Sequence, residues 1–233
     1  MADWTTTVRQ SLPKLVQVLR HMRPTFHVAG IADISPDFVR ESGFELMLWD
    51  IDGTLGPWHC QALDLEQAQA WAALTQMPKV RHVILSNCGD SRWQELGRLF
   101  PEVPVLRGFQ GPRAVVARQH LGGIESWVGD AGLSASTSSL QAVRKPSAEL
   151  VQVALRAGGC DRPEAAVMIG DQYLTDVAGA GMAGVRSIKV MTIGRRSFPL
   201  AVRVLQRIEE LLYRLFHGRY SRSNPPRRTG PND

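Results

Sequence analysis

The 233-residue chain is 44% hydrophobic, 7% aromatic and 21% charged, and its formal net charge is +5. This composition excludes a fibrous or low-complexity protein and predicts one soluble α/β domain, with or without an extension, that buries its own core. The apolar runs are too short to span a membrane, and we expect no secretion signal in the first ten residues. Cys60, Cys88 and Cys160 lack a CxxC spacing, which indicates reduced thiols in a cytoplasmic protein rather than a disulfide or zinc framework.

The positive charge is concentrated at the two ends of the chain. Residues 1–30 hold four Lys/Arg and one acid, and residues 189–233 hold ten Lys/Arg and three acids, so the centre is net acidic. Basic ends favour a polyanionic surface, either nucleic acid or anionic lipid. Solvated surface and a disordered tail would give the same pattern.

Helices and strands alternate along most of the chain. An apolar stripe predicts a first helix over 11–23, capped by Ser11, and a loop with a short helix then leads to a strand at 45–50. Further strands are expected at 80–86, 103–106, 125–130, 165–171 and 185–190, and helices at 64–76, 91–99, 112–121, 147–157, 174–182 and 199–216. Residues 129–139 read as a small-residue loop. This alternation predicts βαβ units and a parallel sheet, whose ligand site lies at the carboxyl ends of the strands.

Polar side chains follow three of the predicted strands and precede one helix. These residues are Asp50 and Asp52, Ser86 and Asn87, Asp171 and Asp176, and Lys145 before helix 147–157. A parallel sheet would bring them to one edge, where several carboxylates repel one another unless a cation balances them. Mg²⁺ prefers such oxygen ligands, and Gly53 would let the loop turn tightly and direct amides at an anion. The pattern favours phosphoryl chemistry.

Four ordered motifs, "DIDGTL", "LSN", "RKP" and "GDQYLTD", resemble those of the haloacid dehalogenase (HAD) superfamily of phosphohydrolases. They extend from Asp50 to Asp176. The resemblance implies a HAD-like Rossmannoid parallel sheet flanked by helices, without a large cap, here with amphipathic helices at both termini. It also implies a Mg²⁺-dependent phosphomonoesterase.

The resemblance implies a role for each matching residue. Asp50 would be the nucleophile that forms an aspartyl-phosphate, and Asp52 the general acid and then the general base. The phosphate would be held by Thr54, Gly53, Ser86, Asn87 and Lys145. Mg²⁺ would be held by Asp50, Asp171 and the backbone carbonyl of Asp52. Asp176 would support the site, either by orienting Lys145 or from behind the metal ligands.

A finer similarity covers the segments "RPTFHVAGIADISPDFVRESGFELMLWDIDGTL" and "IGDQYLTDVAGAGMAGVRSIKV". They are similar to the HAD subfamily III branch of YqeG-type and mitochondrial phosphatidylglycerophosphate phosphatases. The similarity implies dephosphorylation of phosphatidylglycerophosphate by a cytoplasmic protein peripheral to the inner face of the membrane. Two departures are Gly53, where that branch often has asparagine, and the long interval from Asn87 to Lys145. The extra length, 108–140, would be an added βα unit or a small cap, and it leaves the substrate open.

Two other functions stay open at this point. One is a phosphatase for a soluble sugar or nucleotide phosphate, with 108–140 as a selective lid. The other is a vestigial HAD fold that binds nucleic acid through its basic ends, although the complete set of acids and lysine argues against it, and we expect no obligate nucleic acid. Trp58 and His59 would either touch a substrate head group or pack over the loop.

The expected organisation has four parts. Residues 1–43 form an N-terminal amphipathic helix and lead-in, 44–198 the phosphatase domain, 199–218 a basic amphipathic helix and 219–233 a disordered tail. The two terminal helices are most simply interpreted as covering the core. The basic face beside the apolar face of the last helix also suits an anionic lipid surface.

Overall fold

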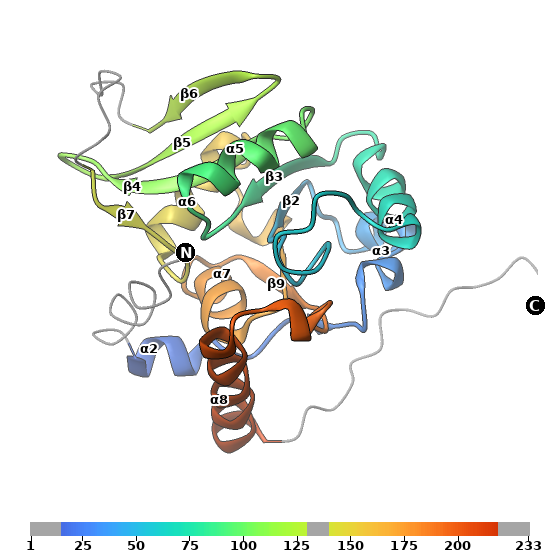
Figure 1. Cartoon of the computed structure of the whole chain (residues 1–233), viewed down its shortest axis with the longest axis vertical. Coiled ribbons are helices and arrows are strands. Elements are labelled where there is room, and N and C mark those ends of the chain that lie inside the picture. The colour runs from blue at the N-terminus through green and yellow to red at the C-terminus, as the bar shows by residue number, and fades with distance from the viewer. Residues whose placement is uncertain (1–14, 130–139, 219–233) are drawn as a thin grey trace, which may run out of the picture.

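The computed structural model describes residues 15–129 and 140–218 (Figure 1). Its strands are β1 (Phe26–His27), β2 (Leu46–Trp49), β3 (Arg81–Leu85), β4 (Val105–Gln110), β5 (Val115–Leu121), β6 (Ile124–Val128), β7 (Ala142–Val143), β8 (Ala166–Gly170) and β9 (Arg186–Lys189). They form one sheet in the order β1-β9-β8-β2-β3-β4-β5-β6, with β7 also paired to β4. The pairs from β1 to β4 in this order are parallel. The predicted α/β class with a parallel-dominated sheet is therefore confirmed.

Helices cover both faces of this sheet (Figure 1). The α-helices are α2 (Leu15–Arg20), α3 (Pro36–Glu41), α4 (Leu65–Thr75), α5 (Asp90–Leu99), α6 (Ala148–Ala157), α7 (Ala178–Met182) and α8 (Leu200–His217). Shorter turns are η2 (Ile31–Asp33), η3 (Pro163–Ala165) and η5 (Arg195–Ser197), which are 3₁₀, and η4 (Tyr173–Val177), which is a π-helix.

The side chains of β2 show how the sheet divides the core. Met47 and Trp49 pack into the cluster that includes residues of α3, α4 and α5, whereas Leu46 and Leu48 pack into the cluster with α6 and α7. Successive side chains of a strand point to opposite faces, so a strand buried on both faces is apolar throughout. The whole of β2 is accordingly buried, which fixes the position of the residues that follow it.

Two expectations about the middle of the chain are wrong. Residues 112–121 were expected to be helical, but 115–121 form β5, which pairs antiparallel with β4 and with β6. The extra length therefore does not add a βα unit over 115–128; it extends the sheet as a hairpin. The small-residue loop lies outside the described residues except for Gly129, as do the cap at Ser11 and the tail 219–233.

Helix α8 has an orientation that its sequence pattern does not suggest. The expectation that its apolar stripe covers the core is wrong, because Val204, Ile208, Leu211 and Leu215 are each 45–70% exposed. The buried face is instead formed by Val202, Gln206, Glu209 and Tyr213. The short α2 lies beside α8 (Figure 1). Nε2 of His217 in α8 lies 2.7 Å from the carbonyl oxygen of Leu19 in α2. Within the described ranges, every helix is too short or too polar to cross a bilayer.

His82 in β3 generates a prediction about stability against pH. Burial lowers its pKa to about 4, below the ordinary value of 6.5, and its Nδ1 accepts a hydrogen bond from Trp49 Nε1 at 3.1 Å. Because the pKa of His82 is lower in the folded state than in the unfolded state, neutral His82 contributes to stability above pH 6.5. This contribution is lost as the pH falls toward 4. Relative to His82→Gln, the wild-type free energy of unfolding should fall by about 2 kcal/mol between about pH 7 and pH 5 in urea titrations. If the free energies of unfolding of the two proteins change with pH in the same way, the prediction is wrong.

Candidate active site

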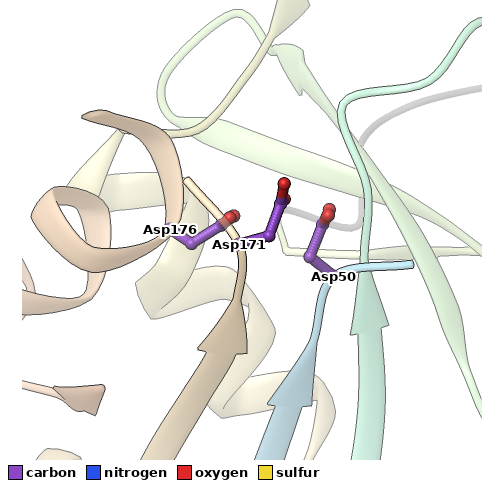
Figure 2. Close-up of side chains that lie close together, drawn as sticks. All are labelled: Asp50, Asp171 and Asp176. Carbon is purple, nitrogen blue, oxygen red and sulfur yellow. The ribbon is translucent and has the colours of Figure 1, made fainter. Parts of the chain in front are cut away.

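Three carboxylates meet at the carboxyl edge of the sheet (Figure 2). Asp50 follows β2, Asp171 follows the neighbouring strand β8, and Asp176 lies in η4. One oxygen from each lies within 4.8 Å of the others, and all three side chains are buried. The parallel pairing of β2 with β8 places the first two acids side by side, as the motif order predicts.

Lys145 inserts its ammonium group among these acids. Its Nζ lies 2.6 Å from Asp50 Oδ1 and 2.7 Å from Asp176 Oδ1, and the residue is 2% exposed. The backbone of Lys145 is held by the side chain of Asn87, which accepts from its N–H at 2.8 Å and donates to its carbonyl at 3.1 Å. Asn87 follows β3, so this amide ties the Lys145 loop to the sheet.

The charges of the cluster do not balance. Burial raises the pKa of Asp50 well above its ordinary value; Lys145 opposes this, and Asp176 and Asp171 add to it. Burial and the charge of Asp176 raise the pKa of Asp171 to about 6. Burial disfavours the charged form of Lys145, but the attraction of Asp176 and Asp50 outweighs it and raises its pKa. Lys189, which is also buried, opposes the rise for Asp171, so the ammonium groups of Lys145 and Lys189 together face three acids, which leaves room for a further cation.

The residues present fit a magnesium ion. Oδ1 of Asp171 is buried and has no hydrogen-bond partner within the described residues, and Oδ2 is 3.4 Å from Gln206 Nε2 of α8. Asp50 and Asp171 offer the hard oxygen ligands that Mg²⁺ prefers. Gly53 adopts φ +97°, and a Cβ there would lie 2.7 Å from Asp171 Oδ2. Only glycine lets the loop pass this close to the carboxylate.

Asp52 lies outside the acid cluster and has its own partners. Its Oδ1 accepts from Arg92 Nη2 at 2.8 Å and from the backbone N–H of His59 at 3.0 Å. Asp52 and Arg92 are both buried, at 9% and 2% exposure. The side chain predicted to transfer a proton is therefore held by a buried guanidinium group on α5 and by the loop after β2.

The structure separates the residues expected to bind phosphate. Ser86 and Asn87 line the same pocket as Asp50 and Lys145. Thr54 is wholly buried, does not line this pocket, and its hydroxyl has no hydrogen-bond partner within the described residues. The Gly53 N–H donates to the Gly56 carbonyl at 2.7 Å, so this amide is used within the loop.

The pocket above the acids is bordered by two segments. Trp58 and His59 line it from the loop after β2, and the Trp58 ring packs against Phe198 with centroids 5.0 Å apart. Val202 and Leu205 line it from α8. In the segment 108–140, no residue that the structure describes lines the pocket.

Sequence reasoning gives no role to several residues at the site, among them Arg92, Arg144 and Gln206. Arg144 lines the pocket next to Lys145. A signal for Gln206 exists, since Val202, Gln206, Glu209 and Tyr213 recur at helical spacing and form one face. Arg92 directly precedes Trp93, and the side chains of both residues are buried. A buried charge such as that of Arg92 needs a partner.

One comparison with known proteins, a match to a family model, agrees with this chemistry at the level of the superfamily. A family model described as HAD-hydrolase-like matches residues 142–197, the part that carries Lys145, Asp171 and Asp176, and supports membership in the HAD superfamily. No curated protein matches the chain. A crystal structure of an uncharacterized protein from Listeria monocytogenes serotype 4b aligns with a TM-score of 0.40 and 19% identity, over 63% of this chain and 78% of that one.

The unbalanced acid cluster predicts stabilisation by magnesium. At about 100 times its Kd, Mg²⁺ should stabilise the fold by about 2.7 kcal/mol, a rise of roughly 5–10 °C in Tm relative to EDTA. Asp171→Asn should lose this rise, because it replaces a hard carboxylate ligand of the acid cluster with an amide. Asp161→Asn, at an exposed acid outside the cluster, serves as the matched control and should keep the rise. An undiminished rise in Asp171→Asn would place the ion elsewhere.

Proposed function

We propose that this chain is a Mg²⁺-dependent phosphomonoesterase that dephosphorylates phosphatidylglycerophosphate to phosphatidylglycerol at an anionic membrane surface. The HAD-hydrolase-like match and the buried acids support a phosphatase of this superfamily. The lipid substrate rests on one observation about α8. This helix lines the pocket with Val202 and Leu205 and turns its apolar stripe outward.

In the first step, Asp50 attacks the phosphorus of the monoester. Lys145 holds Asp50 Oδ1, and within the described residues no hydrogen bond occupies Oδ2, which is the oxygen left to form the new P–O bond. The P–O bond to the leaving alcohol breaks, and that oxygen takes a proton from Asp52. The Lys145 ammonium stabilises the charge on the transferring group.

In the second step, a water molecule attacks the phosphorus of the aspartyl-phosphate. Asp52 takes the proton from that water, the acyl-phosphate bond breaks, and inorganic phosphate and the Asp50 carboxylate are released. Asn87 keeps Lys145 in place throughout through its two backbone hydrogen bonds. Asp50 and Asp171 would hold Mg²⁺, which would supply positive charge that favours the ionised form of both acids and offsets the charge of the phosphoryl group.

The outer face of α8 has the composition of a surface-binding helix. Its exposed apolar residues are accompanied by Arg207 and Arg214, which are exposed, and by the half-buried Arg203. The acids of α8 do not oppose this charge, since Glu209 is buried and Glu210 pairs with Arg195. An apolar stripe flanked by guanidinium groups suits the headgroup region of an anionic bilayer.

The substrate proposal predicts release of inorganic phosphate from phosphatidylglycerophosphate in vesicles, with Mg²⁺ present. Asp50→Asn should lower kcat/KM by at least about 10³-fold, because an amide cannot form the covalent intermediate. Asp37→Asn, at an exposed acid in α3 outside the pocket, is the matched control and should keep full activity. Turnover of soluble sugar or nucleotide phosphates alone would overturn the lipid substrate, and salt-dependent RNA binding without any phosphatase activity would favour the vestigial alternative.

The surface proposal predicts that binding depends on the outer face of α8. The double variant Ile208→Asp/Leu211→Asp should lower the partition coefficient onto phosphatidylglycerol vesicles by at least about 100-fold in sedimentation, since each buried side chain contributes about 1.5–3 kcal/mol. Both positions are exposed, so the fold should be unaffected. Ile124→Asp, at a more exposed residue of β6, should bind like the wild type. Equal losses in both variants would contradict a specific role for α8.

A further inference from the structure

The two oxygens of Asp52 have different surroundings. Oδ1 accepts both hydrogen bonds that the carboxylate makes within the described residues, from Arg92 Nη2 at 2.8 Å and from His59 N at 3.0 Å. Oδ2 has no such bond there. The carboxylate is therefore anchored at one oxygen, although Asp52 lines the pocket.

The Arg92 side chain is buried and makes several polar contacts. It is 2% exposed, and its Nη1 donates to the Cys60 carbonyl at 2.9 Å and lies 3.3 Å from Glu95 Oε2. The planar guanidinium group can bind several acceptors at fixed angles, so it joins the Asp52 side chain to the loop at Cys60.

The second anchor is a strained backbone. His59 has φ +56°, in the left-handed region that a residue with a side chain rarely adopts. In this conformation its N–H reaches Asp52 Oδ1. Such strain persists only where surrounding contacts enforce it, and here the neighbouring carbonyl of Cys60 is held by Arg92.

We infer that Arg92 is a positioning residue, which fixes the Asp52 carboxyl through Oδ1 so that Oδ2 is the oxygen that exchanges a proton with the leaving group. The inference rests on the proposed phosphomonoesterase activity but not on the lipid substrate. The competing role for Arg92 is only to stabilise the loop at Cys60 through its hydrogen bond to the Cys60 carbonyl. The two roles differ in their dependence on the leaving group.

Two small phosphomonoesters, one of a phenol and one of an alcohol, separate these roles. 4-Nitrophenyl phosphate releases a phenolate that departs without a proton, whereas benzyl phosphate releases an alkoxide that requires one in the transition state. A misplaced Asp52 slows the second substrate far more than the first. A loosened loop slows both by the same factor.

The experiment compares kcat/KM for the two substrates in Arg92→Met, Arg92→Lys and the wild type. Arg92→Met should lower kcat/KM by about 100-fold for benzyl phosphate and by less than about tenfold for 4-nitrophenyl phosphate. Arg92→Lys, which keeps the charge but not the fork of donors, should show the same preference to a smaller degree, and it carries the test if Arg92→Met does not fold. Arg98→Met, at an exposed arginine of the same helix, is the matched control and should leave both values unchanged.

A crystal structure of an Arg92 variant gives a readout independent of activity. The Asp52 carboxyl should have left the His59 N–H. An unchanged Asp52, or equal losses for both substrates in an active enzyme, overturns the inference alone. A wild-type chain that hydrolyses no phosphomonoester overturns the proposed function, and this inference with it.

Discussion

The burial of Lys145 between Asp50 and Asp176 is the constraint on which the site depends. A buried ammonium group is stable only with close partners, and removing one of them leaves an uncompensated charge. Each partner comes from a different part of the sheet edge, one after β2 and one after β8. The parallel pairing of these strands is therefore required both for the core and for the lysine. Asn87, after β3, extends the same requirement to a third strand.

The same constraint accounts for the irregular turn after β8. Asp176 must turn back toward the strand, and its Oδ2 accepts from the Gln172 N–H at 3.1 Å. A Cβ on Gly170 would lie 2.3 Å from the Asp176 carboxyl, so only glycine leaves this space. The turn itself is a π-helix, a form that recurs at functional sites because it redirects a side chain without ending the helix.

The convergence of the motif residues was more predictable from the sequence than the structure around them. Asp50, Asp171 and Lys145 lie next to strands or a helix cap, so the parallel topology alone brings them together. The prediction of a helix over 112–121 is wrong because a short run such as Val115–Ala117 fits either the helical or the strand period, and pairing with β4 decides for a strand. Arg92 could not be foreseen, since its partner Asp52 is forty positions away in the sequence.

Helix α8 shows why an apolar pattern does not identify the buried face. Its inward side makes polar contacts beside the site: Glu209 accepts from the Leu174 N–H at 3.1 Å, and Gln206 reaches Asp171. Burial raises the pKa of Glu209 to about 8, and the Leu174 N–H and Lys189 oppose this rise. Burying Glu209 in its charged form is therefore unfavourable. Tyr213, stacked on Tyr173 at 4.3 Å, supplies apolar contact on the same side. Placement of α8 thus depends on contacts with η4 and Asp171, which leaves Ile208, Leu211 and Leu215 exposed.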